Sequence, residues 1–132
     1  MVVAPGRHQR CLVVDDDPLL RWSLVRFLEA RGREARSVES GRLALALLQE
    51  WPVELLITDA CLSGMDEPEL VKRCQGLRRR PGIILLTEGE APPPPRDLDE
   101  FGVLGVIEKP LILDSLARLL AGIQKKAGSA AA

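Results

Sequence analysis

The 132-residue sequence is poor in the features that mark several classes of protein. It has no tyrosine, two tryptophans, two phenylalanines and one histidine, and its formal net charge is −1. Neither this charge balance nor the cluster Arg78 to Arg80, which has no aromatic residues interleaved, indicates a protein that binds nucleic acid directly. We therefore interpret the arginine cluster as a solvated loop.

Long apolar runs are also missing. No stretch approaches the ~20 residues that cross a bilayer, and residues 1–10 contain no apolar segment of signal-peptide length. The three cysteines, Cys11, Cys61 and Cys74, show no spacing typical of a zinc site or a disulfide framework. These absences predict a cytoplasmic protein that is neither secreted nor inserted into a membrane.

The composition is that of a soluble globular domain, with 46% hydrophobic and 28% charged residues. The length suits one domain. We expect that domain to span residues 10–124, between an N-terminal extension (1–9) and a flexible tail (125–132).

Short apolar segments alternate along the chain with segments of helical periodicity. Strands are expected over 11–14, 35–38, 53–58, 83–86 and 103–107. Helices are expected from Pro18 to near Gly32, from Ser40 to Pro52, over about 68–77, and around the leucines 113 to 120, with Asp17 and Ser40 as N-caps. The apolar face of the second helix is predicted to contain Leu43, Ala44, Leu47 and Leu48.

This alternation predicts an α/β fold: a doubly wound, five-stranded parallel sheet in the flavodoxin-like order 2-1-3-4-5, with helices on both faces. The fourth helix region is the exception. Four consecutive prolines, Pro92 to Pro95, allow at most a short helix over 96–101.

Polar residues end four of the five expected strands. They are Asp15 and Asp16 after the first, Asp59 after the third, Thr87 after the fourth and Lys109 after the fifth. Because ligands of open parallel sheets bind beyond the carboxyl ends of the strands, these side chains are expected to converge on one site. Three neighbouring carboxylates repel one another unless a cation lies among them, and carboxylate oxygens suit Mg²⁺. Lys109 and Thr87 suit an anionic phosphoryl oxygen.

Taken singly, these residues have simpler explanations. Asp15 and Asp16 could cap a helix, Lys109 could be a surface lysine, and Thr87 could merely end a strand. A metal-dependent phosphatase would need a further acid or base, for which there is no motif. A nucleotide-binding module would need a GxGxxG or P-loop sequence, and neither is present.

As an ordered set, the motifs resemble the response-regulator receiver family. They are Leu-Val-Val-Asp-Asp-Asp-Pro at 12–18, Leu-Leu-Ile-Thr-Asp at 55–59, Gly-Met-Asp at 64–66, Leu-Leu-Thr at 85–87 and Glu-Lys-Pro at 108–110.

The resemblance implies that Asp59 is the phosphoacceptor, with Thr87 and Lys109 contacting the phosphoryl group. It implies that Asp15, Asp16, Asp59 and the backbone carbonyl of Cys61 bind Mg²⁺. A sensor histidine kinase or a phosphotransfer protein would supply the phosphoryl group in a two-component phosphorelay. A downstream protein target or an effector domain outside this chain would receive the signal, and a homodimer is compatible with this interpretation. Such a phosphoprotein is a signalling module rather than an enzyme.

Some positions depart from the family pattern. Val106 replaces the usual aromatic residue of the fifth strand, Glu88 replaces a small residue after Thr87, and Leu62-Ser63 replaces Met-Pro. Together with the prolines, Val106 and Glu88 support an alternative: a pseudo-receiver that acts as an interaction scaffold without phosphorylation. The intact acids argue against this alternative.

Overall fold

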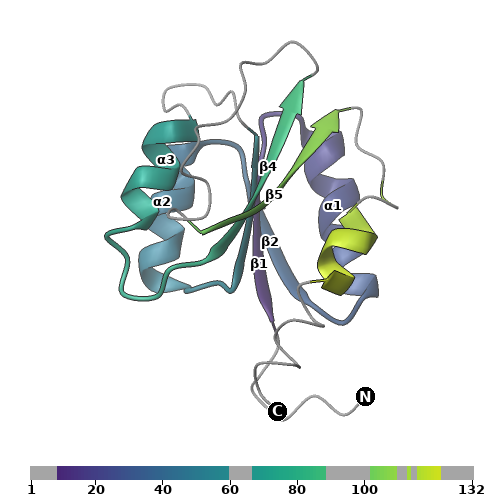
Figure 1. Cartoon of the computed structure of the whole chain (residues 1–132), viewed down its shortest axis with the longest axis horizontal. Coiled ribbons are helices and arrows are strands. Elements are labelled where there is room, and N and C mark those ends of the chain that lie inside the picture. The colour runs from purple at the N-terminus through teal and green to yellow at the C-terminus, as the bar shows by residue number, and fades with distance from the viewer. Residues whose placement is uncertain (1–8, 60–66, 89–101, 110–112, 114–115, 123–132) are drawn as a thin grey trace.

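The structure, a computed structural model, describes residues 9–59, 67–88, 102–109, 113 and 116–122. Its strands form one parallel sheet in the order β2-β1-β3-β4-β5 (Figure 1). The strands are β1 (Arg10–Val14), β2 (Glu34–Val38), β3 (Leu55–Asp59), β4 (Gly82–Glu88) and β5 (Val103–Lys109). The predicted flavodoxin-like order is therefore confirmed.

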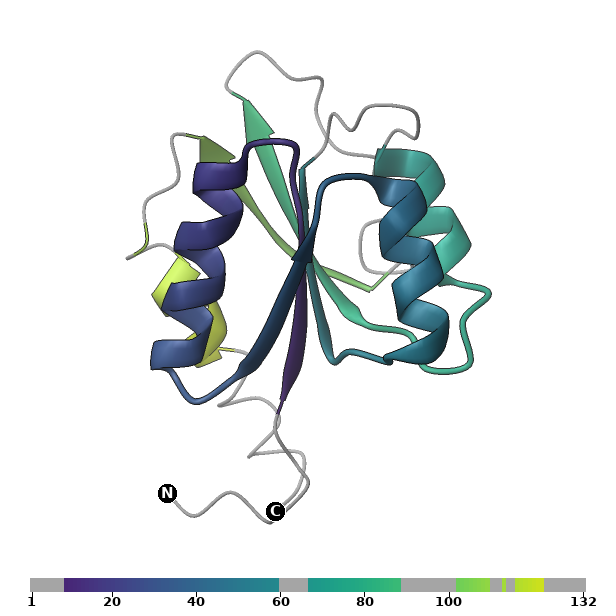
Figure 2. The ribbon, with the colours of Figure 1, turned by 180° about the vertical axis from the view of Figure 1, so that it is seen from behind.

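Helices cover both faces of the sheet. On one face lie α2 (Gly41–Glu50) and α3 (Glu67–Cys74), and on the other lie α1 (Pro18–Ala30) and a C-terminal helix over 116–122 (Figures 1 and 2). Asp17 and Ser40 are the N-caps of α1 and α2, as predicted, and each side chain accepts a hydrogen bond from a backbone N–H in the first turn. None of the helices described is long and apolar enough to span a bilayer.

The interior strand β1 contributes to a core on each face of the sheet, which explains its continuous apolar sequence. Leu12 and Val14 pack in the cluster that includes α2 and α3, whereas Cys11 and Val13 pack in the cluster that includes α1 and the C-terminal helix. All four side chains are fully buried. The acidic residues that follow β1 are thus attached to a strand whose side chains are buried on both faces of the sheet.

The predicted strand over 53–58 is found two residues later at its start, as Leu55–Asp59. Two other strands extend two residues beyond their predicted C-terminal ends. Expected to end at residues 86 and 107, β4 and β5 remain paired through Thr87↔Glu108 and Glu88↔Lys109. The apolar sequence pattern stops where polar side chains begin. The backbone hydrogen bonds that pair the strands do not require apolar side chains, so the pairing continues beyond that point. As a result, Lys109 is the last residue of a strand rather than a loop residue.

The apolar face of α2 differs in part from the predicted one. Ala44 and Leu48 are buried, whereas Leu43 is 47% exposed. Leu43 is rotated by about 100° from Ala44 around the helix axis, which turns it away from the sheet. The other helical differences are at the ends: α3 ends at Cys74 rather than near Leu77. The expected short helix over 96–101 and the prolines Pro92 to Pro95 lie outside the described residues.

Candidate functional site

Three carboxylates meet at the carboxyl end of the sheet. One oxygen from each of Asp15, Asp16 and Asp59 lies within 4.8 Å of the others. The strand register brings these acids together. Val14 of β1 pairs with Thr58 of β3, so the acidic residues that follow them in sequence are neighbours. Asp15 and Asp59 are buried, at 0% and 6% exposure, whereas Asp16 is exposed. The sheet thus forms a cluster that is enclosed on one side and open on the other.

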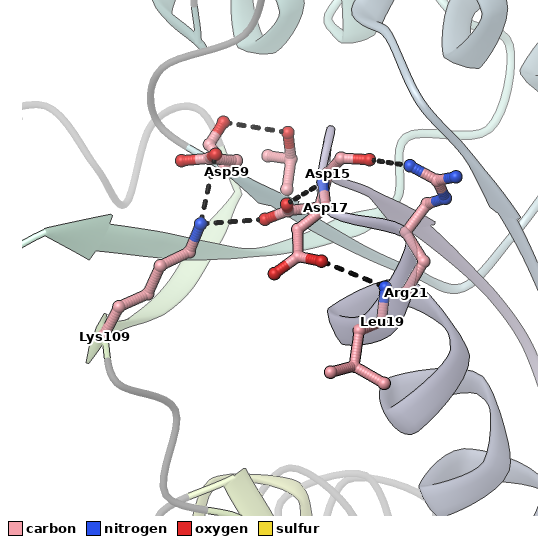
Figure 3. A network of polar contacts seen from close by, with 7 residues as sticks. Asp15, Asp17, Leu19, Arg21, Asp59 and Lys109 are labelled. Atoms are coloured by element: carbon pink, nitrogen blue, oxygen red, sulfur yellow. Dashed lines mark hydrogen bonds and ion pairs between the residues drawn. The ribbon is translucent and has the colours of Figure 1, made fainter.

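Lys109 completes this cluster from β5. Its Nζ lies 2.9 Å from Asp15 Oδ2 and 3.1 Å from Asp59 Oδ2, so a single ammonium bridges both buried acids (Figure 3). Burial alone would lower the pKa of Lys109, but the hydrogen bonds and negative charges of the two aspartates outweigh burial and raise its pKa. Lys109 is therefore a cation in this site.

The charges of the cluster leave room for a divalent cation. Three carboxylates and one ammonium carry −3 and +1, which leaves −2 among groups that share one small volume. The available donors are carboxylate oxygens, which are hard ligands of the kind Mg²⁺ prefers. By both charge and donor type, the residues fit that ion.

Backbone groups hold Asp15 in place. Its Oδ1 accepts a hydrogen bond from the Asp17 N–H at 2.8 Å, and its own N–H donates to the Val38 carbonyl at 3.2 Å. Its carbonyl accepts a hydrogen bond from Arg21 Nη1 at 2.6 Å (Figure 3).

Arg21 is not among the site residues predicted from the sequence. One feature of the sequence could have indicated its role. A cation near the N-terminus of a helix interacts unfavourably with the helix dipole, so an arginine in this position is expected to have a partner elsewhere.

Thr87 lies one residue beyond Leu86, the register partner of Asp59. Its side chain is half-buried, and among the described residues no hydrogen bond joins it to the acids or to Lys109. Cys61 and the side chain of Glu88 lie outside the described residues. Val106 is described: it pairs with Leu85 and is 38% exposed.

A separate cavity of about 450 Å³ lies where α2 and α3 end, away from the acidic cluster. Its lining includes Leu48, Pro52, Leu77, Arg78 and Arg79. All three residues of the arginine cluster 78–80 are exposed, in agreement with the interpretation as a solvated loop. None of the predicted site residues lines this cavity.

Comparison with known proteins agrees with this architecture. The family model described as "Response regulator receiver domain" matches residues 11–121. The response regulator receiver protein CpdR of Brucella abortus is 32% identical over 108 residues, which cover 82% of this chain and 90% of CpdR. The DNA-binding transcriptional regulator NtrC of Salmonella typhimurium is 29% identical over 114 residues, which cover 82% of this chain and 23% of NtrC.

This chain thus spans about a quarter of the length of NtrC and of two other transcriptional regulators that it matches. Among solved structures, the chemotaxis response regulator CheY4 of Vibrio cholerae superposes with a TM-score of 0.74 at 27% identity, over 89% of this chain and 98% of CheY4. The strand order, the family match and these relatives agree. The chain belongs to the response regulator receiver domain family.

Proposed function

We propose that this receiver domain accepts a phosphoryl group on Asp59 from a partner histidine kinase or phosphotransfer protein. Asp15, Asp16, Asp59 and the Cys61 carbonyl would hold Mg²⁺, which supplies positive charge to the anionic phosphoryl oxygens when bound. Lys109 would contact one phosphoryl oxygen, and the Thr87 hydroxyl another. The signal would pass by protein–protein contact in the cytoplasm, so the domain serves as a signalling module rather than as an enzyme with its own substrate.

The observation that carries this proposal is the bridge from Lys109 to both buried acids. A lysine that contributed only to solubility would be expected to extend into solvent. The Lys109 ammonium instead lies 3.1 Å from Asp59 Oδ2. That position is suited to neutralising charge on a group attached to Asp59, since transfer of an anionic phosphoryl group to a carboxylate needs electrostatic stabilisation. The family's other strand-end acids, Asp15 and Asp16, are present beside it.

In the proposed step, an Asp59 carboxylate oxygen attacks the phosphorus of a phosphohistidine. The O–P bond forms as the P–N bond breaks, and the leaving imidazole nitrogen keeps the electron pair. The exposed side of the cluster, at Asp16, leaves an approach for the donor. The product is an acyl phosphate on Asp59 and an unphosphorylated histidine.

Acetyl phosphate tests this chemistry without knowledge of the kinase. We would incubate the protein with acetyl phosphate and Mg²⁺, follow its intact mass over time, and run Asp59→Asn and a sample with EDTA in parallel. The expected result is a phosphoryl adduct on the wild type alone. An adduct that persists in Asp59→Asn would show that the acceptor is another residue.

One observation favours the scaffold as a second candidate. Val106 presents an exposed aliphatic side chain on β5, where the family pattern has an aromatic ring that couples phosphorylation to output. A folded wild type that gains no adduct under these conditions would support the scaffold and contradict the proposal for Asp59.

A further inference from the structure

The two acids that follow β1 are held in different ways. Each polar group of Asp15 has a partner: both carboxylate oxygens, the N–H and the carbonyl. Asp16 is exposed, and no contact within the described residues holds its carboxylate. The direction of the Asp16 side chain therefore depends on the backbone, and above all on the peptide group that joins it to Asp15.

Arg21 holds this peptide group. Its Nη1 donates to the carbonyl of Asp15 at 2.6 Å, and the side chain reaches back from the fourth residue of α1 (Figure 3). The first turn of α1 is itself fixed, because Asp17 Oδ1 accepts from the Leu19 N–H at 3.0 Å and the Asp17 carbonyl accepts from the Arg21 N–H at 3.0 Å. The guanidinium thus connects a rigid helix to the peptide that carries Asp16.

We propose that Arg21 is a positioning residue for the cation site, which fixes the peptide between Asp15 and Asp16 and so directs the Asp16 carboxylate toward the ion. This inference rests on the proposed function, because it requires that the acidic cluster bind Mg²⁺. Groups outside the ligand set that orient the ligands commonly change metal affinity when they are removed.

The direction of the change in Mg²⁺ affinity distinguishes a positioning role of Arg21 from a purely electrostatic one. Arg21 brings a positive charge close to the acids, and like charges repel. If Arg21 acted only through its charge, replacing it with a neutral residue would strengthen Mg²⁺ binding. If Arg21 positions Asp16, the same replacement weakens binding despite the favourable loss of repulsion.

We would titrate Mg²⁺ alone into ¹⁵N-labelled protein and follow backbone amide shifts, which measure weak affinities and report directly on Asp16. Arg21→Met is expected to raise the Kd for Mg²⁺ about 10-fold. It should also shift and broaden the Asp16 amide signal before metal is added. Arg26→Met is the matched control, because the Arg26 guanidinium lies over the Trp22 ring at 5.4 Å and its removal changes the net charge equally. Its Kd is expected to stay within about 2-fold of wild type.

A double-mutant cycle tests the route through Asp16. In an Asp16→Asn background, Arg21→Met is expected to cause little further loss of affinity. A loss as large as in the wild-type background would overturn the inference, as would an unchanged or tighter Kd for Arg21→Met alone. If Arg21→Met does not fold, Arg21→Lys replaces it: lysine keeps the charge and loses the planar guanidinium donor, and it too is expected to weaken binding.

The experiments distinguish a failure of the proposed function from a failure of the positioning role of Arg21. A folded wild type that binds no Mg²⁺ overturns both proposals. A wild type that binds Mg²⁺ and is phosphorylated on Asp59, beside an Arg21→Met variant of unchanged Kd, overturns the positioning role alone.

Discussion

The guanidinium carbon of Arg36 lies 4.3 Å from the centroid of the Trp51 ring. Arg36 belongs to the edge strand β2, and Trp51 follows directly after α2, where it is only 6% exposed. Arg10 approaches the same ring at 5.3 Å. One buried aromatic ring thus joins the end of α2 to two neighbouring strands by cation–π contacts.

Replacing Arg36 with methionine should lower the free energy of unfolding by about 1 kcal/mol, because the ring loses a closely placed cation while an apolar stem of similar length remains. Urea denaturation would measure the difference. Arg42→Met, on the exposed surface of α2, is the control and should change stability by less than about 0.5 kcal/mol. Equal effects of the two variants would contradict a specific contact with Trp51.

Lys109→Met should destabilise the metal-free protein by about 2 kcal/mol, since it leaves the carboxylates of Asp15 and Asp59 buried without their shared cation. Urea denaturation in EDTA would measure this loss. Because a divalent ion compensates the same charges, saturating Mg²⁺ should reduce the difference from wild type.

Lys72→Met controls for the loss of one lysine, because Lys72 is exposed on α3. Its unfolding midpoint should match that of wild type in EDTA. Identical midpoints for Lys109→Met and wild type in EDTA would show that the bridge does not stabilise the fold.

The thiol of Cys74 should not react in the folded protein at pH 8. The side chain is fully buried, and burial raises its pKa to about 11. In a Cys61→Ser background, a chromogenic disulfide reagent should label no thiol of the native protein and two thiols per chain in urea, since Cys11 is buried as well. Labelling of the native protein at the rate seen in urea would contradict the burial of both thiols.

The same pKa predicts how stability depends on pH. An unfolded Cys74 loses its proton near pH 9, whereas the folded residue keeps it to about pH 11. The folded state therefore binds more protons in this window, and stability falls as pH rises, by up to about 1 kcal/mol per pH unit. The stability advantage of wild type over Cys74→Ala should narrow between pH 9 and 11, and a constant difference would contradict this prediction.

Two glycines should respond to alanine in opposite ways. A methyl group at Gly105 of β5 would lie 2.6 Å from Leu119 Cδ2, whereas one at Gly122 would meet nothing within 4 Å. Gly105→Ala should cost about 1 kcal/mol as Leu119 moves aside. Gly122→Ala should be neutral or slightly stabilising, because alanine is the better helix former. Thermal unfolding of both variants would show whether β5 and the C-terminal helix pack this closely.

The sequence predicted the sheet and the convergence of acids because both follow from local patterns. A buried apolar run followed by an acid can be recognised without knowing the rest of the fold, and parallel topology brings such ends to one edge. The helix caps Asp17 and Ser40 were predictable for the same reason. Long-range register and side-chain reach are not encoded locally, so the bridge from Lys109 to Asp15 could not be derived from spacing.

Arg21 was missed for a related reason. A pattern of apolar residues identifies the buried face of α1 but does not show where a long polar side chain bends back. Similarly, the exposure of Leu43 depends on the precise rotation of α2 against the sheet. Such contacts depend on tertiary packing, which the pattern of apolar and polar residues along the sequence does not reveal.

The bridge from Lys109 spans 94 residues of chain to Asp15 and 50 residues to Asp59. Because β1, β3, β4 and β5 are adjacent in that order, the Lys109 ammonium reaches the two acids only when β5 has paired with β4. During synthesis, the acids of β1 and β3 are therefore made long before the cation that balances them. A chain that stops before residue 103 keeps all three acids and lacks the lysine, so the complete charge arrangement distinguishes a finished domain from a truncated one.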